Sequence, residues 1–500
     1  MKMKFVIPAI LIALITIVIF VYGRSSIQQY TGICENANGI DLPSNGAQEY
    51  MPSDDIEPVY VPAAYEIELN DDQDDIYDAA ALPVFPGFVS DRVRIVAKPQ
   101  WALYQVGSFR EGMSWAIAWY QVEGMDWRSF RYGYINIHGE IVIPFEHLVG
   151  EIGTSAAVMP NDFSQGLVFV SPINTGGTDY CAAGFFDKNG ELIIPIESGW
   201  ASSFSEGLAW VFDYGFIDNT GSLVLPTTYA WAFPFSNGAA GIVRDMYNWA
   251  WGGWSYIDIY GNALTPCIYC DVGTFSDGLA AVRIDNKTGF INNRGEVVIP
   301  LDFDVGLSEY DGRPYLRHFR EDLAAVSQIE WLEEWNQHGQ QYFNRRWGFI
   351  DTRGDIAVPL LYSWAHDFFD GRAMVSREDE EGGSGVGFVD TYGNEIIPIG
   401  KFDSVSPFSE GFAAVSRGGW GFIDRYGNEV IPLIYNNAFR FSHGLAAVQE
   451  MLDIGNAGKW GFIDIEGNVV VPFIFNDVRD FTEGVAWVRY GDLWGLIGIK

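Results

Sequence analysis

The stretch Trp420–Pro432, WGFIDRYGNEVIP, decides the fold because its spacing recurs nine times along the chain. In each copy a glycine is followed six residues later by a second glycine and five residues after that by a proline; Ser255 replaces one first glycine. The connections between copies vary in length, and an invariant core with variable connections indicates tandem structural repeats. The second glycines are Gly139, Gly190, Gly221, Gly261, Gly295, Gly354, Gly393, Gly427 and Gly467. The prolines are Pro144, Pro195, Pro226, Pro266, Pro300, Pro359, Pro398, Pro432 and Pro472.

Each copy has the pattern of a β-hairpin. WGFID is rich in aromatic and β-branched residues, which favour a strand. In the following turn, Asp424 is expected to accept hydrogen bonds from backbone N–H groups, and Gly427 to adopt a positive φ. The returning strand ends at Pro432 because proline has no N–H for the strand ladder.

A second motif, FSEGLAAV or a variant of it, precedes each hairpin. Its LAAV part predicts a third strand, so each repeat unit is expected to be a three-stranded antiparallel meander. The motif begins at Phe109, Phe163, Phe204, Phe235, Phe275, Phe368, Phe408, Phe441 and Phe481, with a degenerate copy at Phe319.

The motifs count to ten units, and the tenth reaches only Trp494–Ile497 of its hairpin. Val93–Ala97 resembles an orphan third strand that would complete this unit and close a ring. Neighbouring first glycines lie 31 residues apart at Gly184 and Gly215. Propeller blades usually have four strands and about 40 or more residues, in rings of about 4–8 blades. Unit length therefore favours an all-β open hairpin solenoid, with a closed propeller-like ring as the alternative.

The repeat resembles the WG-repeat (KWG-repeat) family of bacterial proteins. The copies that carry the resemblance are Lys459–Asp464, Trp420–Asp424 and Trp347–Asp351, and the repeats extend from about Phe109 to Lys500. The resemblance implies a repeat architecture with a packed aromatic position, represented by Trp347, Trp420 and Trp460. It implies no general reaction, cofactor or metal.

The N-terminus has the pattern of a membrane anchor. Residues Phe5–Gly23 are uncharged, and about 20 apolar residues span a bilayer. Lys2 and Lys4 would remain in the cytoplasm by the positive-inside rule, which leaves the repeats outside it. No clear small-residue cleavage site follows, although a cleaved secretory signal is the alternative. We therefore divide the chain into an anchor (1–24), a stalk (25–90) and a repeat domain (91–500).

Composition restricts the partners. The chain has 65 acidic and 30 basic residues and a net charge of −35, which opposes binding to nucleic acid or to anionic headgroups. The stalk contains several prolines and the acidic run Asn70–Asp75, which lacks the glycine and terminal glutamate of a calcium loop. A solvated linker is the simpler interpretation.

The sequence does not predict an enzyme. No H-E-x-x-H, G-x-S-x-G or phosphate-loop pattern occurs. Asp424, Asp464 and their equivalents recur once per repeat and are replaced by asparagine in two copies, which fits turn capping better than paired acid–base catalysis. Cys267 and Cys270 form one C-x-x-C pair, whereas a structural zinc site needs four ligands. We expect no cofactor and no metal; the cysteines form either a local disulfide or two free thiols.

The functional prediction rests on aromatic insertions between the LAAV strand and the WGFID strand. Insertions at one place per repeat map to one face of an array, which is often the binding face. Aromatic side chains there would bind a cell-wall glycan or a protein. The alternatives are that these aromatics pack on the array, that the array is an envelope scaffold, or, more remotely, that the protein is a carbohydrate-active enzyme. The candidate ligand-binding residues are Trp115, Trp119, Trp127, Trp249, Trp251, Trp331, Trp335 and Tyr342.

Overall fold

The computed structural model describes most of the repeat region. All the described residues belong to one compact part of the chain, Asp78–Lys500. They form strands and no helix, so this part contains no segment that spans a bilayer as a helix. The anchor predicted for 1–24 lies outside the described residues, as does most of the stalk. The described ranges are 85–121, 128–148, 160–171, 184–196, 200–226, 229–244, 253–307, 314–335, 341–378, 384–452 and 457–500.

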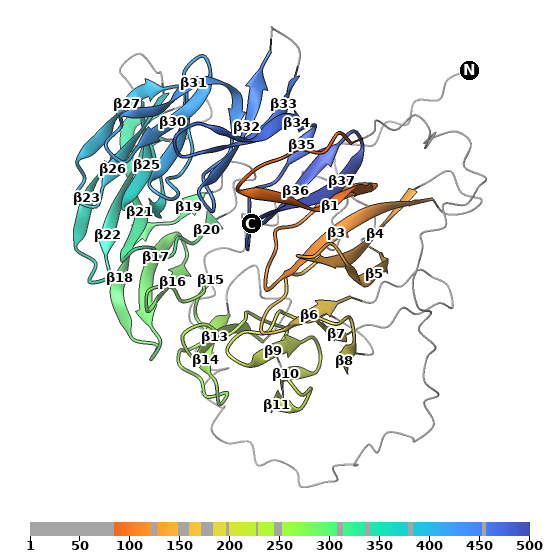
Figure 1. Cartoon of the computed structure of the whole chain (residues 1–500). Helices are drawn as coiled ribbons and strands as arrows, with labels where there is room; N and C mark the ends of the chain where they lie inside the picture. The colour runs from red at the N-terminus through yellow and green to blue at the C-terminus, as the bar shows by residue number, and fades with distance from the viewer. Residues whose placement is uncertain are drawn as a thin grey trace, which may run out of the picture. The chain divides into compact units, whose positions relative to one another are not determined.

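The strands follow the ten predicted units in chain order (Figure 1). Unit 1 contains β2 (Leu103–Val106), β3 (Met113–Gln121), β4 (Arg128–Asn136) and β5 (Ile141–Leu148), and unit 2 contains β6 (Leu167–Val170), β7 (Gly184–Asp187) and β8 (Leu192–Pro195). Unit 3 contains β9 (Leu208–Val211), β10 (Gly215–Asp218) and β11 (Leu223–Pro226), and unit 4 contains β12 (Trp231–Ala232), β13 (Ala239–Val243) and β14 (Trp254–Asp258). Unit 5 contains β15 (Asp271–Val272), β16 (Leu279–Ile284), β17 (Lys287–Asn292) and β18 (Val297–Asp304), followed by the small hairpin β19 (Gly306–Leu307) and β20 (Pro314–Tyr315).

The second half of the array repeats the same order. Units 6 and 7 contain β21 (Leu323–Trp335), β22 (Gln341–Asp351) and β23 (Ile356–Tyr362), then β24 (Trp364–Phe369), β25 (Arg372–Glu378), β26 (Ser384–Asp390) and β27 (Glu395–Phe402). Unit 8 contains β28 (Ser404–Val405), β29 (Phe412–Ser416), β30 (Trp420–Asp424) and β31 (Glu429–Ala438). Unit 9 contains β32 (Leu445–Met451), β33 (Ala457–Asp464) and β34 (Val469–Phe475), and unit 10 contains β35 (Asp477–Val478), β36 (Val485–Tyr490) and β37 (Leu493–Ile499).

The sheets confirm the antiparallel meander, with one addition. Each unit was expected to have three strands, but in several units the connection before the phenylalanine motif forms a short strand that precedes the other three, as β28 does in the order β28-β29-β30-β31. This short strand pairs with the LAAV strand, so a unit has up to four strands. Among the described residues no sheet closes into a barrel.

The first glycine of the motif is required by a close approach of two strands. Trp420 pairs with Tyr435 and Phe422 with Ile431, so the third strand bulges opposite Gly421. A Cβ on Gly421 would lie 2.5 Å from the Ile431 carbonyl oxygen, and no side chain fits there. Unit 4, in which Ser255 replaces this glycine, keeps only isolated bridges in place of a third strand.

The second glycine forms the turn as expected. Gly427 has a φ of 82°, and its N–H donates to the Asp424 carbonyl over 3.0 Å. In most units the turn glycine also packs on the third strand of the preceding unit: a Cβ on Gly427 would lie 3.0 Å from Ile397 Cγ1. The turn glycine of unit 1 packs in the same way: a Cβ on Gly139 would lie 2.8 Å from the Cβ of Ala97.

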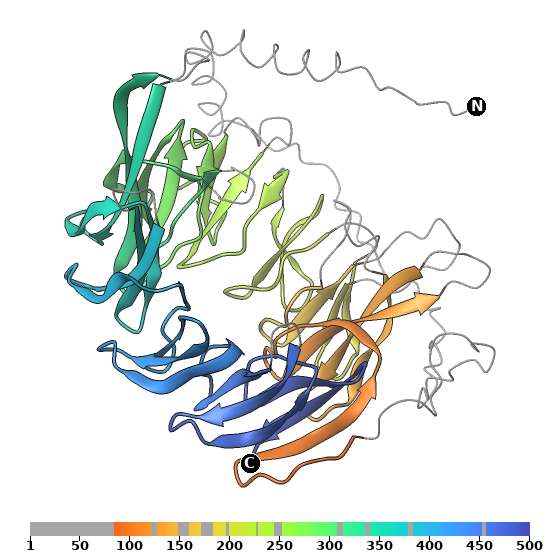
Figure 2. The same cartoon turned by 90° about the horizontal axis from the view of Figure 1, so that it is seen from above.

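The array closes on itself. β1 (Val93–Trp101) pairs antiparallel with β37 and completes unit 10, so the last unit has the strand order β35-β36-β37-β1. In Figures 1 and 2 the first coloured segment accordingly lies beside the last. The open solenoid favoured from unit length is therefore wrong for the described residues, and the closed alternative holds. Unit length did not distinguish the two arrangements, because closure depends on the pairing of β1 with β37, which unit length does not report.

A belt of hydrogen bonds from the phenylalanine motif joins consecutive units. In this motif, which begins with phenylalanine, the glycine at the fourth position follows a residue that has a positive φ; in unit 8 that residue is Glu410, with a φ of 55°. The Glu410 carboxylate accepts the N–H groups of His443 and Gly444 in the next unit over 2.7 and 2.8 Å. The belt also crosses the closure, where Glu483 of unit 10 accepts the N–H groups of Glu111 and Gly112 over 2.7 and 2.6 Å.

The hydrophobic core is distributed over the interfaces between units. One cluster packs unit 8 on unit 9 through Phe422, Phe441 and Ile463. Another packs unit 10 on unit 1 and includes Trp101 and Trp487. Each unit therefore has too little core of its own and depends on both neighbours.

Candidate functional site

The pairing register gives every unit two distinct ends. In unit 9, Leu445 pairs with Asp464, which brings the phenylalanine motif and the glycine turn to the same end, here called the turn end. Gln449 pairs with Trp460 at the opposite end, where the LAAV strand leads into the WGFID strand. All insertions between these strands belong to this opposite end, called the insertion end.

The longest described insertion extends the hairpin β21–β22 in unit 6. Leu323–Ser327 is buried like the LAAV strand of every unit, but the pairing continues outward to Trp335 opposite Gln341. Beyond Ser327 and Trp347, the described side chains at 328–332 and 343–346 are exposed or half-buried. The insertion is therefore a ladder of paired strands that projects from the insertion end.

Two aromatic side chains are exposed on this projection. Trp331 and Phe343 face each other across the hairpin in one register pair, with ring centroids 5.4 Å apart and an interplanar angle of 65°. Trp331 is 59% exposed and Phe343 46% exposed. Paired strands fix both backbones, so the two rings form a preorganised apolar platform with polar neighbours, Glu330 and Asn344.

The insertion of unit 1 also lengthens its hairpin, β3–β4, but the assignment of Trp115 to this insertion is wrong: Trp115 pairs with Tyr134, as Ala325 pairs with Phe349 in unit 6, and so lies within the LAAV strand. Trp115 is half-buried against the cluster that contains Ile117, Tyr134 and Phe163. Its indole leaves no room for a side chain on Gly107, where a Cβ would lie 2.5 Å from it. Trp115 therefore has the packing role that the sequence left open.

The other candidates are only partly described. The backbones of Trp119, Trp335 and Tyr342 lie in β3, β21 and β22, all at the insertion end, while their side chains lie outside the described part. Trp127, Trp249 and Trp251 lie outside the described residues. The structure thus brings Trp119, Trp331, Trp335 and Tyr342 to the insertion end, with Trp331 in the platform, and leaves Trp115 in the LAAV strand.

The repeat tryptophans have the expected structural position. Trp347 and Trp460 are 4% and 7% exposed, and Trp420 is half-buried. The tryptophan position tolerates substitution, because Tyr132 fills it in unit 1 and Thr288 in unit 5.

The repeat aspartates cap their turns. Asp424 Oδ1 accepts the N–H groups of Tyr426 and Asn428, both over 2.9 Å, and Asn428 Nδ2 donates to Oδ2. Burial opposes ionisation of Asp424, but these hydrogen bonds outweigh it and lower its pKa. The pKa of Asp464 is lowered in the same way. An ionised carboxylate that accepts hydrogen bonds from its own turn is suited to capping that turn.

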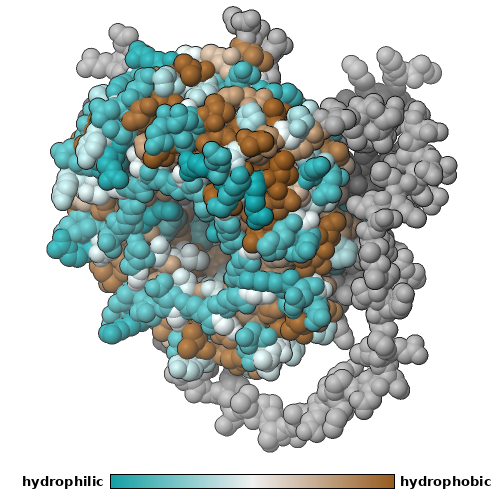
Figure 3. Space-filling model, viewed as in Figure 1, coloured by the Kyte–Doolittle hydropathy of each residue, from teal (hydrophilic) through white to brown (hydrophobic). Residues whose placement is uncertain are grey.

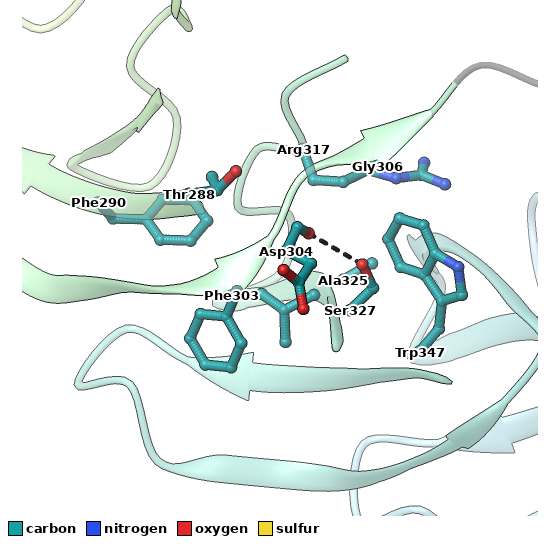
Figure 4. Close-up of a pocket in the computed structure, with 10 residues that line it drawn as sticks. Thr288, Phe290, Phe303, Asp304, Gly306, Arg317, Ala325, Ser327 and Trp347 are labelled. Carbon is teal, nitrogen blue, oxygen red and sulfur yellow. Dashed lines mark hydrogen bonds between the residues drawn. The ribbon is translucent and has the colours of Figure 1, made fainter. Parts of the chain in front are cut away.

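A small pocket lies where unit 5 lacks the repeat tryptophan (Figure 4). Thr288, Asp304, Arg317 and Trp347 line it, and the Ser327 hydroxyl donates to the Asp304 carbonyl over 2.9 Å. Thr288 is buried, and its hydroxyl has no hydrogen-bond partner within the described residues. The pocket volume of about 20 Å³ has room for about one water molecule, which this hydroxyl would bind. A sugar ring does not fit.

Cys267 and Cys270 are free thiols, so the local disulfide is not formed. Cys267 Sγ lies 3.6 Å from the Ser255 hydroxyl, and the Asp285 N–H donates to Cys270 Sγ over 3.3 Å. Among the described residues there is no cluster of three or more potential metal ligands.

Exposed apolar residues are dispersed over the face seen in Figure 3, where hydrophobic and hydrophilic residues alternate around a hollow. Exposure by itself therefore does not select a site; the platform stands out because two aromatics are paired on a projecting hairpin. Sequence reasoning missed three further exposed turn aromatics, which share the tripeptide YGN: Tyr260, Tyr392 and Tyr426. It also missed the contact of Phe85 and Phe88 with unit 9, for which the repeat pattern contains no signal.

The profile of the family described as "WG containing repeat" matches residues 132–146, 184–212, 214–245, 254–287, 289–328, 347–379, 387–419, 420–450 and 460–494. These segments cover more than half of the chain. The chain belongs to the WG-repeat family. The matched segments contain the bulged strand pairs described above. Comparison with curated proteins found no match.

Several solved structures show distant likeness. One is PorZ, a surface component of the type-IX secretion system of Porphyromonas gingivalis (10% identity, 79% of this chain and 68% of that chain, TM-score 0.23). Others are the WD40 domain of Toxoplasma gondii coronin (8%, 84% and 87%, 0.22) and Drosophila Plexin A in complex with Semaphorin 1b (7%, 82% and 88%, 0.24). These TM-scores are too low to support an argument about fold or function.

Proposed function

We propose that this WG-repeat protein is a non-enzymatic binding protein that holds a cell-wall glycan or a protein ligand at its insertion end. The observation that carries the proposal is the exposed Trp331–Phe343 platform on the projecting β21–β22 hairpin. Exposed aromatic rings on rigid backbones bind sugar faces and act as hot spots in protein interfaces.

The closed array supports this role. Hydrogen bonds between consecutive units, across the closure as well, give the hairpins a rigid base, which reduces the entropy lost on binding. Anchoring by residues 1–24 and an extracytoplasmic position of the array are part of the proposal. The negative net charge favours neutral or cationic ligands.

The proposal is tested with the purified full-length chain on a glycan array and in peptidoglycan and cell-surface protein pull-downs. The double variant Trp331→Ala/Phe343→Ala should lose at least about tenfold in affinity for the ligand found, since each anchor contributes about 1–2 kcal/mol. Tyr426→Ala, which removes an aromatic side chain that is 70% exposed at the turn end, is the matched control and should bind normally.

If no glycan or surface protein binds, or if the double variant binds as well as the control, the platform is not the site. An array that binds nothing while remaining rigid and folded is better described as an envelope scaffold.

A further inference from the structure

Two tryptophan side chains stack across the junction of units 3 and 4. The ring centroids of Trp200 and Trp231 lie 4.8 Å apart, with an interplanar angle of 20°. The fully buried ring of Trp210 packs against both, at 6.0 Å from Trp200 and 5.4 Å from Trp231. The three rings hold one another in place, and the pair Trp200 and Trp231 is called the tryptophan step.

The tryptophan step is open to solvent. Trp231 is 37% exposed, and Trp200 is half-buried. Because Trp200 covers one face of the Trp231 indole, the exposed area of Trp231 belongs to its other face and its edges. The step therefore presents a flat aromatic surface on a rigid base, which reduces the entropy lost when a ligand binds.

The fold does not require an aromatic side chain at this position of the repeat. Trp200 and Trp231 occupy equivalent positions, four residues before Phe204 and Phe235 of the phenylalanine motif. Packing of the array thus leaves an exposed tryptophan pair in two neighbouring units unexplained. Five other units have a polar residue at this position: Gln105, Asp271, Ser404, Asn437 and Asp477.

The tryptophan step lies at the insertion end. Trp231 pairs with Val243, which in turn pairs with Trp254 at the insertion end of unit 4. The Trp200 carbonyl accepts the N–H group of Phe212, in the short turn between β9 and β10 of unit 3, over 2.8 Å. The step and the platform of unit 6 therefore share one end of the array.

Hydrogen-bonding groups lie next to the tryptophan step. Arg244 is exposed and follows Val243, the register partner of Trp231. Its guanidinium carbon lies 5.7 Å from the centre of the Tyr229 ring, two residues before Trp231 in the chain. An exposed guanidinium donates several hydrogen bonds to hydroxyl oxygens. A sugar ring has the complementary surface, with an apolar face of C–H groups and hydroxyl groups at its rim.

A polar stretch separates the tryptophan step from the platform. Unit 5 lies between them, and its hairpin at the insertion end is short, because Ile284 pairs with Lys287. Asp285, Asn286 and Lys287 at the tip of this hairpin are exposed. Neighbouring sheets pack about 10 Å apart, so two junctions separate the aromatic surfaces by on the order of 20 Å.

This separation favours a polymeric glycan over a protein. A protein interface has one continuous apolar centre surrounded by a polar rim. Two small aromatic surfaces with a polar hairpin tip between them instead match a chain of sugar rings, which presents apolar faces at intervals and hydroxyl groups between them. The net charge of −35 opposes polyanionic chains.

We propose that the tryptophan step and the platform are two subsites for one neutral glycan chain. The chain stacks one sugar ring on Trp231 and another on the Trp331–Phe343 platform, and its hydroxyl groups contact Arg244 and the polar tip of unit 5. This inference rests on the proposed function and narrows its ligand to a glycan polymer.

Neutral β-linked N-acetylglucosamine oligomers, graded from the disaccharide to the octasaccharide, are the probe, and isothermal titration calorimetry with the full-length protein is the measurement. Oligomers long enough to reach both subsites should bind about a hundredfold more tightly than short ones, because the second contact is intramolecular. Trp231→Ala should abolish this gain while short oligomers still bind the platform, and Trp331→Ala/Phe343→Ala should abolish the gain as well.

Two further variants control for folding and for loss of an aromatic surface in general. Trp231→Tyr keeps an aromatic face and should retain most of the gain with oligomer length. Tyr260→Ala removes a side chain that is 76% exposed at the turn end of the same unit, and it should bind oligomers of every length normally. Thermal unfolding that matches the wild type excludes misfolding as the cause of a loss.

A gain with oligomer length that persists in Trp231→Ala overturns the inference. If Trp331→Ala/Phe343→Ala still weakens binding in that case, the proposed function stands without the second subsite. Absence of binding by oligomers of every length also overturns the inference, and a surface protein that binds through the platform would then be the ligand. Equal losses in Trp231→Ala and Tyr260→Ala would likewise contradict a subsite at the tryptophan step.

Discussion

At the residue scale, close contacts between neighbouring strands decide which residue types fit at single positions of the repeat. Gly421 is glycine because the bulged third strand places a carbonyl oxygen where a Cβ would lie, and the same contact recurs at Gly289, Gly348 and Gly387. The tryptophan beside it is less constrained, since a smaller residue leaves only a pocket the size of a water molecule at Thr288.

Gly421→Ala should therefore destabilise the protein by about 1–3 kcal/mol, the usual cost of overpacking. Urea unfolding and the melting temperature measure the effect. Ser255→Ala is the control, because that position already carries a Cβ and its unit has no regular third strand. Equal stability of Gly421→Ala and wild type would contradict the bulge as the reason for the WG motif.

His147 predicts a dependence of stability on pH. Burial, and then the charge of Arg131, lower its pKa from the usual 6.5 to about 4. The folded state therefore prefers the neutral ring, which packs between Tyr132 and Phe186. Its contribution is complete above pH 6.5, where the unfolded chain is also neutral, and is lost as the pH falls toward 4. A difference of about 2.5 in pKa corresponds to at most about 3 kcal/mol.

His147→Phe should flatten this part of the stability curve between pH 6.5 and 4, as measured by urea unfolding at several pH values. His138→Phe is the control because His138 is exposed in a turn. A curve of unchanged slope in His147→Phe would show that another group causes the acid sensitivity.

At the scale of the element, the phenylalanine motif is a connector between units as well as the start of a strand. In several units a glutamate at its third position accepts two N–H groups of the next unit, as Glu410 does for His443 and Gly444 and Glu321 for Asp370 and Gly371. Position three of unit 9 is His443, and no parallel hydrogen bond from its side chain to unit 10 occurs among the described residues.

His443→Glu should therefore add the missing link to Glu483 and Gly484 and stabilise the protein by about 1 kcal/mol. Glu410→Ala should have the opposite effect of about 1–2 kcal/mol, because two N–H groups lose an ionised acceptor and must rely on water. Melting temperatures of both variants test the connector. A destabilised His443→Glu protein would show that the belt does not extend to this junction.

At the scale of the whole molecule, closure depends on residues far apart in sequence. Trp101 of β1 packs edge-on against Trp487 at 5.8 Å, and the Trp487 indole donates to the Ser114 hydroxyl over 3.0 Å. These contacts join the first and last units and bury their facing apolar side chains, which the terminal units of an open array would expose.

Trp101→Ala should thus cost about 3–5 kcal/mol, as for a tryptophan inside any core. In an open array the same change would be nearly neutral, as we expect for the exposed Trp331→Ala. Urea unfolding compares the two variants, and similar stabilities would argue against closure through β1.

Local pattern predicted much of this protein. The strand, turn and strand of each hairpin follow from alternating apolar residues, the turn aspartate and the two glycines, which act within about a dozen residues of chain. The aromatic insertions were likewise visible as breaks in the repeat. Such features are determined by the sequence itself because their physical causes, φ preference, side-chain periodicity and backbone hydrogen bonding, are local.

Other features depend on contacts that sequence separation hides. Unit length indicated an open array, but the pairing of Val93–Trp101 with Leu493–Ile499 closes it. Trp115 and Trp331 are both candidate binding residues by sequence, yet Trp115 pairs with Tyr134 within the LAAV strand and packs in the core, whereas Trp331 lies on the projecting part of its hairpin and is exposed. Only the tertiary structure decides such outcomes, since burial is a property of the space between units.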